Sequence, residues 1–289
     1  MSAAISQRSI EDQAKASLES WSKNAEFWDS HMGVEGDFLT RLLKVPALEE
    51  LLPLRPGLEL LELAAGNGIY SRHAAAQGVS VLSTDGSVRM VEIASSRTAA
   101  EPSIAGKLEH RVLDLVDANQ MEELAHRHDG KFDVVVMNMA LMDVPDIGPL
   151  AKTLPRILKP GGIFVATLLH PVFATSDATR EIRMTNDPEN RESRVKRTMI
   201  ISKYLNMRPG LGEAVPGQPV KQPYFHRPFH ALFAPFFATG MVLDGLLEPS
   251  FADVVPKNEE RPESWANFEG FPFVLAFRMR NAGQLLAAQ

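Results

Sequence analysis

Cysteine is absent from this 289-residue sequence. Its absence excludes disulfide bonds, thiolate metal sites and cysteine nucleophiles, and it argues against a disulfide-stapled extracellular scaffold. Long apolar runs are also missing, since no segment offers the roughly 18 uninterrupted apolar residues that a membrane-spanning helix needs. Residues 1–15 are polar and lack the apolar stretch of a secretory signal. We therefore expect a cytoplasmic protein with no membrane contact.

Positive charge is in short supply as well. Lys and Arg number 30 against 36 Asp and Glu, the formal net charge is -6, and the basic residues do not gather into one long run. Nucleic-acid binding depends largely on attraction between basic side chains and phosphates. We expect no nucleic-acid partner, and the remaining class is a globular protein whose 45% hydrophobic residues can bury a sizeable core.

Short apolar segments alternate with helical patterns through the middle of the chain. Five segments have the pattern of strands, at residues 58–64, 79–84, 107–113, 134–137 and 163–169. Parallel neighbours need crossover connections, usually helical, so this alternation predicts a doubly wound, mostly parallel, Rossmann-like α/β sheet. A turn is expected at 160–162, a helix interrupted near Pro235 at 228–239, and further strands at 241–247 and 271–280, which bring the sheet to seven strands.

The order of the expected helices and strands divides the chain into four parts. The expected parts are an N-terminal helical cap (1–54), a Rossmann-like core (55–170), a charged and proline-rich lid insertion (171–227) and a C-terminal completion of the core sheet (228–289).

Polar groups follow four of the expected strands, at the edge where open parallel sheets bind ligands. The first strand runs into Glu62 and a loop with Gly66 and Gly68, where glycine lets the backbone approach a ligand closely. The second ends at Asp85, placed so that its carboxylate can accept hydrogen bonds from both ribose hydroxyls of a nucleoside. After the third, Asp114 can accept a hydrogen bond from an adenine amino group.

The floor of this pocket is expected from two further segments. Leu115 can pack on an adenine ring, and Asn138, Met139 and Leu141 follow the apolar fourth strand near the reacting atom. A dinucleotide dehydrogenase is the competing interpretation, but its G-x-G-x-x-G loop needs a glycine where this chain has Ser71.

The segments ELAAGNG, TDGS, LDLVD, FDVVVMNMAL and LPRILKPGGIFVATLLHP, in this order, resemble the motifs of class I S-adenosylmethionine-dependent methyltransferases between residues 58 and 171. The stretch from YFHRPFHALF to FPFVLAFRMR resembles the end of bacterial and fungal small-molecule members, where a helix leads into an antiparallel strand pair. The resemblance implies methyl transfer from S-adenosylmethionine to a small organic acceptor. We expect a monomer or homodimer, and a role in secondary metabolism.

The resemblance also assigns roles. It implies that Glu62 orients the methionine ammonium group, that Gly66 and Gly68 admit the methionine backbone, and that Asp85 holds the ribose. Ala64 replaces the first glycine of the family pattern, and alanine fits there if its φ is negative. The cofactor-binding residues expected in all are Glu62, Ala64, Gly66, Gly68, Asp85, Gly86, Asp114, Leu115, Asn138 and Met139.

Methyl transfer to a hydroxyl can use a general base, and histidine is the usual supplier. His170 follows the fifth strand, at the ligand-facing edge, and His226 lies where the insertion returns to the core; both are candidate catalytic residues. Each histidine can equally have a purely structural role, in which its ring only forms hydrogen bonds with nearby backbone groups. Asp143 can be a base or can cap the next helix, and capping or solvent exposure is favoured.

The acceptor pocket is expected to include Trp28, Met32, Leu141 and Arg227. The tryptophan can equally belong to the cap's own core, and Arg227 can pair with an acceptor carboxylate or with an acidic residue of the lid. His226 and His230 are four apart, but Pro228 between them argues against a helical metal site, so no metal is expected. Oxygen is the favoured acceptor atom, with nitrogen, carbon, or a cofactor-binding protein without transferase activity as alternatives.

Overall fold

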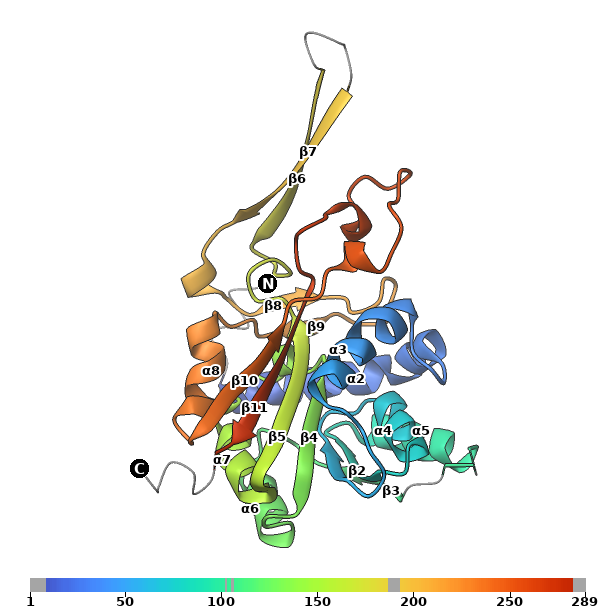
Figure 1. The fold of residues 1–289 in the computed structure, drawn as a ribbon, viewed down its shortest axis with the longest axis vertical. Coiled ribbons are helices and arrows are strands. Elements are labelled where there is room, and N and C mark those ends of the chain that lie inside the picture. Colours follow the sequence, from blue (N-terminus) through green and yellow to red (C-terminus); the bar gives the residue numbers. More distant parts are fainter. Residues whose placement is uncertain (1–8, 102, 105–106, 187–192, 283–289) are drawn as a thin grey trace.

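A seven-stranded sheet forms the centre of the computed structural model, which describes residues 9–101, 103–104, 107–186 and 193–282 (Figure 1). The strands lie in the order β10, β11, β5, β4, β1, β2, β3. Their bounds are β1 Glu59–Glu62, β2 Ser80–Asp85, β3 Leu108–Val112, β4 Phe132–Asn138, β5 Leu158–Leu169, β10 Met241–Leu247 and β11 Val274–Asn281.

The first five strands are parallel, whereas β11 is antiparallel to β5 and β10 is antiparallel to β11. The expected fold class, a mostly parallel Rossmann-like sheet with an antiparallel C-terminal strand pair, is confirmed. Chain order reverses between β1 and β4, and a reversal of this kind opens a crevice at the carboxyl ends of the strands.

Helices cover both faces of the sheet (Figure 1). Successive residues of a strand face opposite sides, so Leu60 packs in one core cluster and Leu61 in the other. One face carries α3 Val45–Leu51, α4 Ile69–Ala76 and α5 Val88–Ala99, and the other carries α6 Ala118–Arg127, α7 Gly148–Ile157 and α8 Phe229–Phe237.

Two local expectations are wrong. The turn expected at 160–162 is an irregular stretch inside β5, which already begins at Leu158 and takes Gly161 through a φ of 78°. Pro235 does not interrupt α8, because it lies near the end of a nine-residue helix, where only one intrahelical hydrogen bond depends on its missing N–H.

The N-terminal part is helical, as expected. Its elements are α2 Ile10–Met32 and a π-helical turn Thr40–Lys44 that continues into α3. The first helix is capped by Ser9, whose Oγ accepts the backbone N–H of Asp12 at 3.1 Å. It lies across the carboxyl-end edge of the sheet, where contacts join it to α5 and to the later segment β9 Gln222–Tyr224.

The expected insertion contains a long antiparallel hairpin, β6 Ala178–Asn186 with β7 Ser193–Ile201, which projects away from the sheet (Figure 1). The other short elements are β8 Gly210–Gly212 and the 3₁₀ turns Leu141–Asp143, Tyr204–Asn206, Phe251–Asp253 and Trp265–Asn267. The division into cap, core, insertion and C-terminal part stays a prediction.

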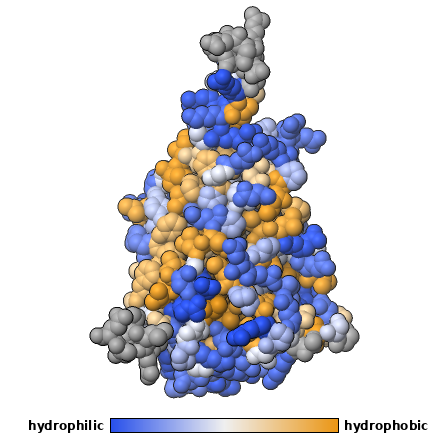
Figure 2. Space-filling view, viewed as in Figure 1, coloured by the Kyte–Doolittle hydropathy of each residue, from blue (hydrophilic) through white to orange (hydrophobic). Residues whose placement is uncertain are grey.

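Hydrophobic and hydrophilic residues are intermixed on the face shown in Figure 2. Within the described ranges, none of the helices combines the length and apolar character needed to cross a bilayer.

Candidate active site

A cavity of about 1100 Å³, including its open mouth, lies at the carboxyl ends of the parallel strands. Glu62, Asp85 and Asn138 are the last residues of β1, β2 and β4, and Asp114 follows β3 by two residues. The predicted residues that line it are Glu62, Ala64, Gly66, Asp85, Gly86, Asp114, Leu115, Asn138, Met139 and Trp28. Four separate sequence motifs therefore meet in one site.

The loop after β1 is held in an unusual backbone conformation. Ala64 has a φ of 51°, so the condition under which alanine would fit without strain is not met, and the residue is strained where glycine would not be. At Gly66, which also has a positive φ, an added Cβ would find only Trp28 Nε1 at 3.8 Å, so this backbone is open toward the cavity. Gly68 does not line the cavity; a Cβ there would press on Ala94 and His110 at 3.2 and 3.3 Å.

Glu62 is buried at the bottom of the site. Ser71 Oγ donates a hydrogen bond to its carboxylate, but burial dominates and raises the pKa of Glu62 to about 7. The hydroxyl of Tyr70, also in the cavity wall, is buried and has no hydrogen-bond partner among the described groups. An ammonium group held here would offset the buried carboxylate, and a carboxylate beside it would satisfy the tyrosine hydroxyl.

Asp85 holds its neighbourhood together through both carboxylate oxygens. One accepts the backbone N–H of Gly66 and the other that of Ser87, each at 2.8 Å, while burial raises the pKa of Asp85 above its ordinary value. Each oxygen keeps a second lone pair, so two ribose hydroxyls can still be accepted. Asp114 is held in a similar way, since its Oδ1 accepts the N–H of Val116 at 2.9 Å.

The end of β4 forms the floor. Thr167 Oγ1 donates to Asn138 Oδ1 at 2.6 Å, and the backbone N–H of Met139 bonds the Thr167 carbonyl at 2.9 Å. Met139 has a φ of 56°. Two non-glycine residues with left-handed backbone angles, Ala64 and Met139, thus follow the ends of the adjacent strands β1 and β4. Both residues line the cavity. Backbone strain of this kind is common at functional sites.

One wall is supplied by α2. Trp21 and Trp28 contact each other edge to face at 5.2 Å, and both line the cavity. Leu18 packs directly on Gly86, where an added Cβ would lie 2.5 Å from Leu18 Cδ2. A larger residue at this position would require the Leu18 side chain to move.

The two predicted catalytic histidines lie elsewhere. His170 is buried, its Nδ1 accepts the N–H of Val172 at 3.2 Å, and its Nε2 lies 2.9 Å from Glu248 Oε1, so both ring nitrogens are engaged. His226 stacks on Tyr224, and burial lowers the pKa of His226 to about 4. Neither imidazole lines the cavity, so their catalytic role stays a prediction.

Three predicted pocket residues also stand outside the walls. Met32 and Leu141 are buried in the surrounding core. Arg227 is turned into the protein, where its guanidinium donates to the carbonyls of Leu141, Phe225, Val144 and Pro145. It therefore fixes the loop after β4 instead of meeting an acceptor.

Sequence reasoning missed several side chains of the wall. Those with polar groups are Ser17, Thr40, Lys44, Asn67 and Tyr70. Local pattern offers no signal for Lys44, which reaches the cavity from a π-helical turn, or for Ser17, which comes from a helix far away in sequence. Tyr70, two residues after the last glycine of the loop, is the one that spacing from the motif could have indicated.

The residues present fit S-adenosylmethionine. Glu62 and Tyr70 would hold its amino-acid end, Asp85 its ribose, and Asp114 with Leu115 its adenine. In the ranges that the structure covers, no group of three or more histidine, aspartate or glutamate residues is placed to hold a metal.

Comparisons with known proteins point the same way. Residues 61–166 match the family model described as "Methyltransferase domain". A ubiquinone biosynthesis O-methyltransferase from Acinetobacter baylyi is 27% identical over 165 residues, which is 57% of this chain but only 65% of that protein.

Solved structures match over more of the chain. An S-adenosylmethionine-dependent methyltransferase from Mesorhizobium loti is 26% identical, with a TM-score of 0.55, over 81% of this chain and 96% of its own. A protein from Listeria monocytogenes shares the fold at 21% identity and a TM-score of 0.59, over 84% and 99% of the two chains. In its motifs, its sheet order and its cavity the chain is similar to the class I S-adenosylmethionine-dependent methyltransferases, and residues 61–166 match a methyltransferase domain.

Proposed function

We propose that this protein transfers the methyl group of S-adenosylmethionine to a hydroxyl oxygen of a small organic acceptor. One observation carries the proposal: the cavity wall includes more residues than those that fit the cofactor, and we assign the part lined by α2 and the loop after β4 to the acceptor, as the acceptor compartment. Its walls there include Leu18, Trp21, Val144 and Pro145. The O-methyltransferase names of the curated relatives support oxygen as the acceptor atom.

Bound S-adenosylmethionine supplies a methyl group that its sulfonium already activates, so the protein has mainly to align the acceptor and to exclude water. The tryptophan-bearing face of α2 covers the site and removes solvent from it. Arg227 and Thr167 hold the floor rigid from below, through the carbonyls of the loop and through Asn138. A rigid floor keeps an acceptor in line with the reacting carbon.

Transfer to nitrogen or carbon is the alternative within the same class, and cofactor binding without transfer is the alternative from another class. A cytoplasmic location, a monomeric or homodimeric state and a role in secondary metabolism stay predictions.

Calorimetric titration tests the cofactor assignment. The purified protein should bind S-adenosylmethionine and S-adenosylhomocysteine in roughly the micromolar range and should not bind NAD. Asp85→Ala should weaken both affinities roughly 10- to 100-fold, because charge-assisted hydrogen bonds to the ribose are lost. The exposed Asp129→Asn serves as the matched control and should bind like the wild type. Binding of NAD but of neither sulfur ligand would overturn the proposal.

A further inference from the structure

Asp143 presents an unusual group to the acceptor compartment. It is the last residue of the 3₁₀ turn Leu141–Asp143, it is only 8% exposed, and it lines the cavity. Its Oδ1 is buried without a hydrogen-bond partner. The capping role favoured from the sequence is wrong, because the residue before α7 is Ile147 and the carboxylate that accepts the N–H of Gly148 belongs to Asp146.

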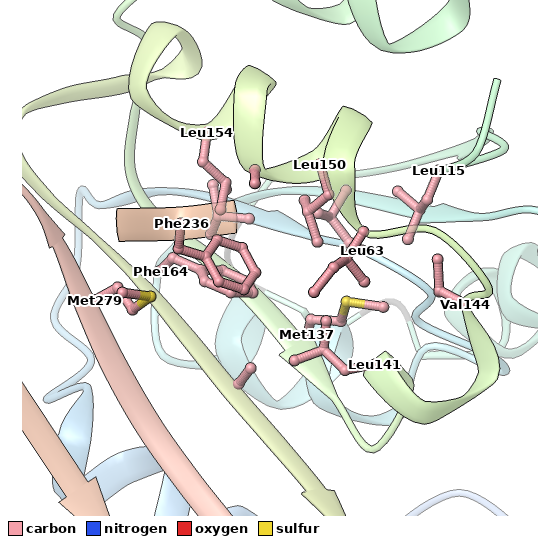
Figure 3. Close-up of a cluster of buried hydrophobic side chains, with 14 of the residues drawn as sticks. Leu63, Leu115, Met137, Leu141, Val144, Leu150, Leu154, Phe164, Phe236 and Met279 are labelled. Carbon is pink, nitrogen blue, oxygen red and sulfur yellow. The ribbon is translucent and has the colours of Figure 1, made fainter. Parts of the chain in front are cut away.

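The carboxyl cannot withdraw from the cavity, because the turn that carries it is held from several sides. Ser17 Oγ of α2 donates to the Asp143 carbonyl at 2.8 Å. Arg227 binds the carbonyls on both sides of it, at Leu141 and Val144. Figure 3 shows the side chains of Leu141 and Val144 packed into the hydrophobic cluster beside α7. An unpaired buried oxygen is costly, and here the surroundings maintain it.

The charged and titratable groups around Asp143 favour a proton on it. Burial is the main reason that the pKa of Asp143 is raised well above its usual range, and the nearby Asp85 adds to the rise. A hydrogen bond with the Trp21 side chain opposes it in part. Tyr224, from β9, also feels the charge of Asp143, which helps to raise the pKa of that phenol. Because its pKa is raised, a carboxylate in such a setting is a stronger base than an exposed one.

We propose that Asp143 is the general base of this enzyme and accepts the hydroxyl proton of the acceptor as the methyl group is transferred. The acceptor oxygen forms the bond to the methyl carbon, and the carbon–sulfur bond breaks with its electron pair left on sulfur. The hydroxyl proton passes to Asp143 Oδ1, and from there to solvent when the site opens. The inference rests on the proposed O-methylation and gives Asp143 the role that the sequence suggested for His170 and His226.

The same geometry selects a class of acceptor. A carboxylate placed beside Asp143 would meet a like charge in a desolvated site, which is unfavourable. Arg227, the cation predicted to receive it, is committed to backbone carbonyls, and the ammonium group of Lys44 in the cavity wall is paired with Asp37 at 3.7 Å. With Leu18, Trp21, Val144 and Pro145 around the carboxyl, the acceptor that fits is an uncharged, largely apolar phenol or alcohol.

The test compares two phenols on wild type, Asp143→Asn and the control Asp129→Asn. The probes are catechol and 4-nitrocatechol, whose hydroxyl is far more acidic and needs little help to lose its proton. At saturating S-adenosylmethionine, Asp143→Asn should lower kcat for catechol by roughly 10²- to 10⁴-fold and should lower kcat for 4-nitrocatechol far less. A merely structural role would lower both alike.

Two further readouts guard against a misfolded variant. Asp143→Asn should bind S-adenosylhomocysteine like the wild type and should unfold at no lower urea concentration, since an unpaired buried carboxyl has been replaced by a neutral amide of the same shape. In the wild type itself, kcat for catechol should fall on the acid side with an apparent pKa above the usual aspartate range. A flat profile between about pH 5 and 8 would overturn the inference, even without a variant.

The outcomes separate the two proposals. Wild type that binds the cofactor but methylates neither catechol, 4-nitrocatechol nor a panel of neutral alcohols overturns O-methylation and, with it, the role of Asp143. Wild type that methylates catechol while Asp143→Asn does so within about threefold overturns only the general base.

Discussion

At the scale of single residues, the site is built from conformations that ordinary residues avoid. Ala64 and Met139 both have left-handed backbone angles at strand ends that line the cavity. Such angles are retained only where the surroundings enforce them, and here the sheet and the hydrogen bonds of Thr167 do so. The sequence showed an alanine in place of a glycine but not its backbone angle, which depends on how the loop meets the sheet.

Ala64→Gly should stabilise the protein by about 0.5–1 kcal/mol, measured by urea unfolding. Relief of left-handed strain is worth about 1–2 kcal/mol, whereas the extra freedom of glycine in the unfolded chain costs about 0.5–1 kcal/mol. Ala65→Gly is the matched control: Ala65 is not among the residues with a positive φ, so the same substitution there should destabilise. Equal destabilisation by both variants would contradict the role of strain.

At the scale of elements, α2 is the wall that completes the site. Hydrogen bonds hold its cavity-facing stretch in place: Asn24 exchanges two hydrogen bonds with the backbone of Val220, at 2.8 and 3.0 Å. Farther along, Asp29 accepts hydrogen bonds from Arg97 and from Asn67 in the glycine loop. Helical periodicity predicted this helix, but its partners lie far away in sequence and have no local signal.

Asn24→Ala should lower the free energy of unfolding by about 1–3 kcal/mol, because the backbone N–H of Val220 is left unpaired against a buried helix face, while the Val220 carbonyl keeps only the hydrogen bond from Gln218 Nε2. It should also weaken S-adenosylhomocysteine binding, since the wall that closes the site is loosened. Urea unfolding and calorimetry measure the two effects. Lys23→Ala, at the exposed neighbouring position, should change neither the stability nor the affinity. If Asn24→Ala lowered the stability without lowering the affinity, the contribution of α2 to the site would be contradicted.

At the scale of the whole molecule, buried titratable groups act in opposite directions on stability. Burial raises the pKa of Glu62, Asp85 and Asp143, so each favours the folded state most when protonated, at low pH. His226 has a lowered pKa and favours the folded state only at higher pH. The stability of the wild type as a function of pH is the sum of these contributions, so a variant is needed to measure one of them.

Glu62→Gln isolates the contribution of one of these groups to stability. Folding raises the pKa of Glu62 from 4.5 to about 7, so its contribution is complete below pH 4.5 and is lost as the pH rises to about 7. Without cofactor, the stability of wild type relative to Glu62→Gln should fall by on the order of 3 kcal/mol across this window. The exposed Glu50→Gln should follow the wild-type curve, and a constant difference for Glu62→Gln would contradict the shift.

Much of the fold could be predicted from local sequence patterns. Strand and helix periodicity, together with crossover logic, predicted the seven-stranded sheet, and residues at four strand ends predicted most of the cofactor wall. This worked because parallel strands place their carboxyl ends at one edge, so residues far apart in sequence are brought together by topology alone. Glu62, Asp85, Asp114 and Asn138 meet for that reason.

The acceptor side depended on packing that no local pattern encodes. Arg227 and the two histidines had the right residue types, yet the fold turns Arg227 toward backbone carbonyls and leaves His170 and His226 outside the cavity. Asp143 had the signature of a cap and became a buried, unpartnered carboxyl. Side-chain direction and desolvation arise only when α2, the loop after β4 and β9 pack together, so only the tertiary structure could decide which polar group faces the acceptor.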